Sequence, residues 1–302
     1  EQIVLARLDG RAFRGRVSGS GRASWLGEQP WSVRIDARDL DISSLRPDLP
    51  GRMSAVATIE GRGFAAEAPW TATLDSLSGV LLGRALTGRG VVSHRGGEYL
   101  LDNLRVAAGS SYAKIDGRCG KLVYLRWNAD LSDLSILHPS LAGGLLSSGT
   151  MRGTPERPEV VAEARGRRIE VGGARIESLS ADVDADLSDA RESHLDVRAL
   201  SISLGPISLE EARLAASGLA RDHVAELEFR TVTPETERAP SVRGSLKATG
   251  GYDAENSTWR GRLEQATVKF PEDAASLLQP AAIEFGGGGG RADPICFTNG
   301  DA

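Results

Sequence analysis

The chain has 302 residues, of which 40% are hydrophobic and 25% charged, the usual proportions of a folded protein. Its net charge of −5 argues against a nucleic-acid partner, because such proteins use a basic surface to neutralise phosphates. Aromatic residues make up only 5% of the chain and glycines number 36, which favours many short strands of small aliphatic residues between tight turns. No run reaches the roughly 18 to 20 apolar positions of a membrane-spanning helix.

One motif occurs twice with identical spacing, which indicates a repeated structural unit. Both copies begin with Asp-x-Ser and continue through a proline and a glycine at the same distances. The residues are Asp41, Pro47 and Gly51 in the first copy and Asp133, Pro139 and Gly143 in the second. Because proline cannot continue a helix, we interpret each copy as a brief helix or irregular turn between runs of strand. Its residues are then structural rather than catalytic.

The runs around these motifs alternate between apolar and polar residues, which is typical of antiparallel strands with one apolar and one wet face. The clearest run, 179–187, is apolar at its odd positions and mostly acidic at its even positions. Similar alternation covers 123–131, 225–229 and 242–248. The apolar parity changes near 200–201, which predicts a β-bulge there. The fold class expected is therefore all-β and antiparallel.

Glycine-containing pairs between these runs predict hairpin turns. They are Gly96-Gly97, Gly172-Gly173, Gly205-Pro206 and Gly250-Gly251, and the single Gly218 gives the same signal. Helical patterns are short and confined to 41–46, 133–137 and 272–279. The glycine run 286–290 predicts a loop, and it lacks the Gly-Lys-Ser/Thr ending of a phosphate-binding loop.

The residues that could carry chemistry do not form a recognisable site. The four histidines lie far apart and are expected in turns or on the surface, and no Gly-x-Ser-x-Gly motif supports a hydrolase. The aspartates of 182–189 have the spacing of a strand's solvent face, not that of a calcium loop. Cys119 and Cys296 are too few for a zinc site, and the sequence leaves open whether they pair. We expect no enzyme activity, no metal and no cofactor.

Three segments carry a resemblance to a known family. They are Leu125-x-Trp127-x-x-Asp130-Leu131, Leu137-x-Pro139-x-Leu141-x-Gly143-x-Leu145 and Gly149-Thr150-Met151-x-Gly153-Thr154-Pro155-x-x-Pro158-x-Val160. In these segments the chain resembles the TamB family, the translocation and assembly module subunits of the AsmA-like superfamily of bacterial envelope proteins. The resemblance is closest over about 125–230, corresponds to the middle, periplasmic part of such a protein, and is loose after about 232.

The resemblance implies an elongated, curved antiparallel β-array, or β-groove, in the periplasm, without enzyme activity. It also implies an apolar interior that shelters phospholipid acyl chains or unfolded strands of outer-membrane proteins. The family's inner-membrane anchor and the region that contacts the outer-membrane partner TamA have no counterpart in this stretch. We therefore expect a TamA-like partner to bind through regions outside it, and the full-length protein to be anchored in the inner membrane by a segment absent here.

The apolar faces of the predicted strands are the candidate cargo surface. They carry Val123, Leu125, Trp127, Leu179, Val183, Leu187, Leu195, Val197, Leu227, Phe229, Val242 and Leu246. The sequence leaves open whether these residues line an open groove or fill a closed core. In the second case the protein would be a closed β-solenoid adhesin or scaffold without lipid.

The two motifs also divide the chain into parts. We expect strands of a truncated preceding unit in 1–40, repeat units in 41–132 and 133–230, and further strands of the array in 231–302.

Overall fold

The computed structural model describes residues 2–44, 49–231, 241–253, 256–286 and 289–299. In these residues the chain is all-β apart from two short 3-10 helices, and each pair of adjacent strands within its units is antiparallel. The predicted fold class, an antiparallel β-array with short helical turns, is confirmed. The chain divides into two compact units, Glu1–Leu137 and His138–Ala302. The four-part division expected from the motifs stays a prediction.

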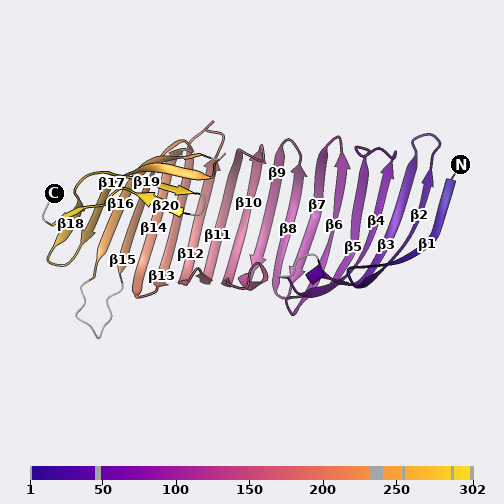
Figure 1. Cartoon of the computed structure of the whole chain (residues 1–302), viewed down its shortest axis with the longest axis horizontal. Coiled ribbons are helices and arrows are strands. Elements are labelled where there is room, and N and C mark those ends of the chain that lie inside the picture. Colours follow the sequence, from indigo (N-terminus) through magenta and orange to yellow (C-terminus); the bar gives the residue numbers. More distant parts are fainter. Residues whose placement is uncertain (1, 45–48, 232–240, 254–255, 287–288, 300–302) are drawn as a thin grey trace. The chain divides into compact units, whose positions relative to one another are not determined.

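The first unit is a sheet in which each strand pairs with the next one in the chain (Figure 1). Gly96 and Gly97, at φ 61° and 77°, form the predicted turn between its sixth and seventh strands, because such φ values favour glycine. The strands are β1 (Gln2–Ala12), β2 (Gly15–Ser24), β3 (Pro30–Asp41), β4 (Gly51–Arg62), β5 (Trp70–Leu81), β6 (Arg84–Arg95), β7 (Glu98–Ala108), β8 (Ser111–Cys119) and β9 (Val123–Leu131). The helices η1 (Ile42–Ser44) and η2 (Leu134–Ile136) lie in the two motif copies.

The second unit continues the same hairpin pattern as far as β17, and then the chain doubles back on that strand. The start of β17 pairs with β19, and the end of β17 pairs with β18. β20 then pairs with β19, and β21 pairs with β18. The strands are β10 (Ala142–Gly153), β11 (Pro158–Val171), β12 (Ala174–Asp186), β13 (Ser193–Leu204), β14 (Ile207–Leu219), β15 (Asp222–Thr231), β16 (Arg243–Asp253), β17 (Thr258–Lys269), β18 (Ala274–Leu277), β19 (Ala281–Gly286), β20 (Gly289–Ala292) and β21 (Phe297–Asn299).

Three local predictions were wrong. Residues 272–279 contain the strand β18 instead of a helix, because pairing with β17 and β21 overrides the helical preference of Ala and Leu. Gly250-Gly251 lies inside β16 rather than in a turn, opposite Gly261 and Arg260, and Gly218 likewise lies inside β14. Gly286 and Gly289 of the glycine run belong to strands and face each other, while 287–288 lie outside the described residues.

The change of parity near 200–201 has a clear structural cause. Ser201 adopts a φ of 51°, and it is skipped in the pairing of β13 with both β12 and β14. The predicted irregularity is therefore present in the backbone, but the register on either side of Ser201 is unchanged, so it is not a bulge that inserts a residue. The hairpin turns at Gly172-Gly173 and Gly205-Pro206 are confirmed as well.

Neither unit has a helix over the apolar face of its sheet among the described residues. Strands make extensive contact only with the strands to which they hydrogen-bond. Most of the buried hydrophobic residues are alanines. The full set is Ala37, Leu86, Ala108, Leu134, Ile169, Ala199, Ala220, Leu263, Ala266 and Ala281. Among the residues described, neither 3-10 helix has the length or hydropathy of a transmembrane helix.

Candidate functional site: an uncovered apolar face

The register of the second unit places the predicted apolar residues in rows that cross successive strands. In the central row Val197 of β13 lies opposite Leu214 of β14, which in turn lies opposite Leu227 of β15. Leu246 of β16 continues this row. Directly opposed residues have their side chains on the same face of the sheet. Four strands therefore contribute large aliphatic side chains to one stripe.

Two flanking rows widen this stripe on either side. One row joins Val183 to Leu195, and the other joins Leu179 through Ala199 and Ala212 to Phe229. All of the large residues in these two rows are half-buried. Their exposure follows from the single layer, because each side chain contacts only neighbours within its own sheet.

Two of the predicted residues lie just beyond the strands. Leu187 follows β12, and its backbone N–H donates to Pro158 O at 3.1 Å. Val242 precedes β16, where its carbonyl accepts from Thr231 N at 2.9 Å. Both are half-buried at an end of the apolar face. The structure thus brings seven predicted residues of this unit into the rows, with these two at their margin.

The remaining predicted residues belong to the first unit. Leu125 of β9 lies opposite Gly117, and this row runs through Leu101 and Val92 toward β1. Trp127 lies opposite Ile115 in the neighbouring row. Val123 begins the same strand and is half-buried, like the other two. The first unit therefore has its own apolar face, built on the same principle.

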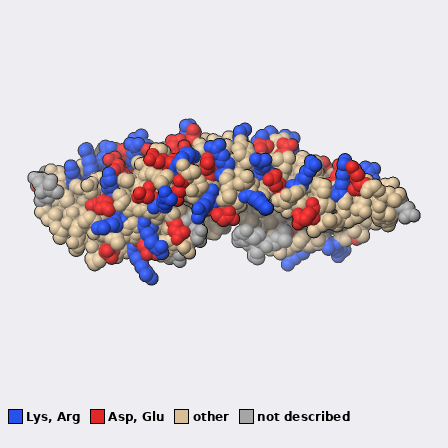
Figure 2. Space-filling view, turned by 90° about the horizontal axis from the view of Figure 1, so that it is seen from above, with Lys and Arg blue, Asp and Glu red and all other residues tan. Residues whose placement is uncertain are grey.

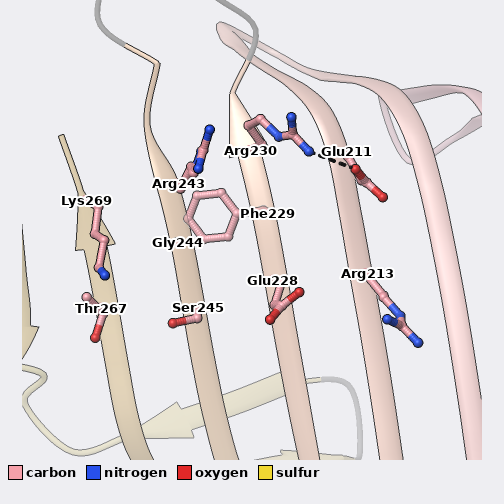
Figure 3. Close-up of a pocket in the computed structure, with 10 residues that line it drawn as sticks. All are labelled: Glu211, Arg213, Glu228, Phe229, Arg230, Arg243, Gly244, Ser245, Thr267 and Lys269. Carbon is pink, nitrogen blue, oxygen red and sulfur yellow. Dashed lines mark hydrogen bonds and ion pairs between the residues drawn. The ribbon is translucent and has the colours of Figure 1, made fainter. Parts of the chain in front are cut away.

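Aromatic rings on the apolar faces lie over glycines of the neighbouring strand. The ring of Phe229 occupies the place where a Cβ on Gly244 would stand (Figure 3). Trp31 covers Gly61 in the same way, and the closest atoms to a Cβ on Gly61 belong to that ring. A glycine in a strand normally leaves a gap in packing, and the ring from the next strand fills it.

Two histidines expected in turns or on the surface join aromatic clusters instead. His94 is only 6% exposed, and its ring centroid lies 5.8 Å from that of Trp70. His223 accepts a hydrogen bond on Nε2 from Trp259 Nε1 at 2.8 Å. Because a ring nitrogen that accepts carries no proton, this contact requires the neutral imidazole. Within the described residues, no group of histidine, cysteine and acidic side chains could hold a metal ion.

The second motif copy anchors η2 to the end of the first unit's apolar face. Arg84 of β6 forms an ion pair with Asp133 and donates to Ser135 Oγ at 3.0 Å. The backbone N–H of Ser135 donates to Asp133 Oδ1 at 2.9 Å. Hydrogen bonds from Ser135, and then from Arg84, hold the pKa of Asp133 below its ordinary value. Leu134 is buried at this end of the strands.

The first copy uses the same local geometry. Asp41 Oδ1 accepts from the N–H of Ser43 at 3.0 Å and from its hydroxyl at 2.5 Å, and these bonds lower the pKa of Asp41. Pro47 lies outside the described residues. Pro139 lies in a turn, and Gly143, at φ 94°, forms a bulge where a Cβ would collide with the carbonyl of Arg168. A Cβ on Gly51 would collide with the backbone of β5, at the carbonyl of Val80.

In both copies an aspartate at a strand end accepts from the serine two residues later, an arrangement called here a corner. Sequence reasoning missed a third corner. Asp186 is wholly buried, and it accepts from the N–H groups of Ser188 at 2.8 Å and Arg191 at 3.1 Å. Burial acts to raise the pKa of Asp186, but the hydrogen bonds from Ser188 and Arg191 outweigh it and the pKa is lowered. The signal was present, since Asp186-Leu187-Ser188 repeats the opening of both motif copies. Alternation with Asp182 and Asp184 concealed it as one more solvent-facing aspartate.

The opposite face of each sheet is charged and pairs its charges within the sheet. Arg213 of β14 lies 3.1 Å from Asp196 of β13, and Lys247 lies 2.9 Å from Glu226. Figure 2 shows Lys and Arg interspersed with Asp and Glu over the visible surface. The cavity shown in Figure 3, about 480 Å³, lies on this face and has acidic and basic side chains among its lining, with Arg230 3.2 Å from Glu211.

The comparison with known families decides the identity of this arrangement. The family described as TamB, N-terminal domain, matches residues 1–302. The chain belongs to the TamB family. No solved structure matches it.

Membership in the TamB family makes this chain part of an envelope protein. The match covers the whole chain, including the part after about 232, where the resemblance of single motifs was loose. The resemblance pointed to the middle of a TamB protein, whereas the matching family is its N-terminal domain. The two uncovered apolar faces are thus features of a TamB domain.

Proposed function

We propose that this TamB domain is a non-enzymatic periplasmic segment that shelters apolar cargo on its uncovered apolar faces. One observation carries the proposal: apolar side chains form rows across successive strands, and these strands make extensive contact only with the strands to which they hydrogen-bond. A soluble domain normally buries such a surface, and a persistent one marks an interaction site. The filled core of a closed adhesin or scaffold finds no support in either unit.

Phospholipid is the cargo that this surface favours most. Each acyl methylene removed from water contributes about 0.8 kcal/mol, so a chain of ordinary length binds without specific polar contacts. The rows around Leu227 offer only hydrocarbon and aromatic groups, and they run on through successive strands of the sheet. Selectivity for one lipid would accordingly be low. A TamA-like partner would act through regions outside this stretch.

Mass spectrometry of the purified chain tests this proposal, with a matched pair of variants. Leu179 and Ser180 are neighbours on opposite faces of β12. L179D places a carboxylate on the apolar face, and we expect co-purified phospholipid to fall by about tenfold or more. S180D adds the same charge between Arg165 and Arg198, where it is tolerated, and should keep the wild-type lipid content. Absence of lipid from the wild type, or equal loss in both variants, would contradict the proposal.

A second candidate cargo is an unfolded strand of an outer-membrane protein. Such a strand presents apolar side chains at alternate positions, which the rows around Leu227 would accept as they accept an acyl chain. Crosslinking from position 227 to a model outer-membrane peptide, by chains that carry no co-purified phospholipid, would favour this cargo over lipid.

A further inference from the structure

A row of three cationic side chains crosses the charged face of the first unit. Arg89 of β6 lies opposite Arg105 of β7, and Arg105 lies opposite Lys114 of β8. Adjacent strands are about 4.8 Å apart, so the three charges follow one another at close spacing. Like charges directly opposite each other destabilise a sheet. This arrangement therefore costs stability unless an anion joins it.

The chain itself neutralises only part of this charge. Lys114 Nζ lies 2.9 Å from Asp116, but Arg105 donates from Nε to the neutral side chain of Asn103 at 2.9 Å. Arg89 forms no ion pair with any residue in the described part of the chain. A hydrogen bond from Lys114 lowers the pKa of the Asp116 carboxyl, and Arg105 lies near enough to help lower it. One carboxylate is thus shared by two cations, and the charge of Arg89 is left for an anion from solution.

A cavity of about 560 Å³ opens over the row, and its lining contains no acidic residue among those described. Thr87 and Tyr112 line it beside the three cations, as does Asn128 of β9, which extends the row. The Tyr112 hydroxyl donates to Asn128 Oδ1 at 3.4 Å, and the amide group of Asn128 also carries N–H donors. Hydrogen-bond donors and positive charge converge on one space.

The second unit has a similar row that differs in one respect. Arg230, Arg243 and Lys269 also lie opposite one another on three strands. However, Glu211 and Glu228 line the cavity beside them, and Glu211 pairs with Arg230 at 3.2 Å (Figure 3). The acids that neutralise the second row are missing from the lining of the first.

We propose that Arg89, Arg105 and Lys114 bind the phosphoryl group of a phosphate-bearing ligand. Guanidinium groups match the oxygens of phosphate in forked geometry, and a tetrahedral dianion can bridge several donors at once. A phosphate also carries more than one negative charge, as a row of three cations requires. This site lies on the face opposite the proposed cargo surface, so either proposal can fail without the other.

Calorimetric titration with inorganic phosphate at low ionic strength tests the site. We expect the wild type to bind, and R89Q and R105Q each to raise the Kd about tenfold or more. The control is R165Q, which removes one exposed charge that lies opposite Leu146 and Ser180 rather than in a cationic row. It should leave the Kd within about twofold of the wild-type value. Because R89Q and R105Q relieve repulsion, both should keep the wild-type circular dichroism and melting temperature.

Vesicle flotation identifies the source of the phosphoryl group. Flotation of the L179D chain with phosphatidylcholine vesicles that contain phosphatidic acid, lost in R89Q, would support a lipid headgroup. Phosphate binding without flotation would support a soluble phosphate compound. Absence of phosphate binding by the wild type, or a loss in R165Q as large as in R89Q, would overturn the proposal.

Discussion

The apolar and charged faces of the same strands differ in how far their own neighbours satisfy them. On the charged face most side chains find a partner in the next strand, as Arg213 does in Asp196. On the apolar face Leu227 and Leu246 also contact their cross-strand neighbours, yet both stay half-exposed. Most charges can pair within one layer, whereas burial of apolar surface needs a second. The charged face is therefore largely satisfied by its own residues, whereas the apolar face is not.

The largest effect on stability is expected from the buried carboxylate at the edge of the charged face. D186A removes the acceptor for the N–H groups of Ser188 and Arg191, and leaves them unsatisfied where Asp186 is wholly buried. We expect the free energy of unfolding to fall by about 1 to 3 kcal/mol in urea titrations. D182A is the matched control, because Asp182 lies on the same face of β12 and is exposed. Equal losses in the two variants would show that the corner contributes nothing special.

A smaller effect is expected on the apolar face. F229A uncovers Gly244 and removes a half-exposed ring, so the loss should be about 1 to 2 kcal/mol, below the 3 to 5 kcal/mol of a fully buried phenylalanine. E228A, at the neighbouring exposed position on the charged face, should change the free energy of unfolding by less than about 0.5 kcal/mol. A larger loss in F229A would indicate that cargo or another element covers this ring.

A still smaller loss of stability is expected at low pH, from protonation of the aspartates at the three corners. The pKa values of Asp41, Asp133 and Asp186 are lower in the folded chain than in the unfolded one. Such groups stabilise the fold above the unfolded pKa of about 3.9, and this contribution is lost as pH falls through their folded pKa values. We expect the urea midpoint to hold between pH 7 and 5 and to drop below about pH 4. D186N should reduce that drop, and an unchanged pH profile in D186N would contradict the assignment.

The smallest effect is expected from a single ion pair of the charged face. Arg213 and Asp196 are 55% and 43% exposed, so water and salt screen their attraction. R213Q should lower the urea midpoint by less than F229A does, and added salt should reduce the difference further. A loss as large as that of F229A would remove the contrast between the two faces.

The sequence predicted the architecture well because the information is local. Alternation along residues 179–187 already specifies which side chains share a face, and Gly96-Gly97 specifies the turn that reverses the chain. The parity change near Ser201 even located an irregularity of the backbone. Antiparallel neighbours joined by short turns leave little freedom in strand order.

The errors arose where a distant strand decides the local structure. Residues 272–279 look helical by composition, but β17 and β21 hold Ala274–Leu277 extended. Gly250 reads as a turn until Trp259 of the next strand is placed beside it. Whether the apolar faces were covered depended on contacts between strands far apart in the chain, which a repeating pattern cannot reveal. The cationic row around Arg105 was invisible for the same reason, since its members come from three strands.

The pairing of each strand with its chain neighbours has a consequence for how such a domain can change in size. Within a unit, loss or gain of one hairpin would shorten or lengthen the apolar face by two strand spacings, about 10 Å. The rows of side chains on either side would still line up on the same face of the sheet, because two strands restore both the strand direction and the alternation of side chains between the faces. Length is thus adjustable in steps of a hairpin, and a protein built this way can be matched to the width of the space it serves without redesign of its surface.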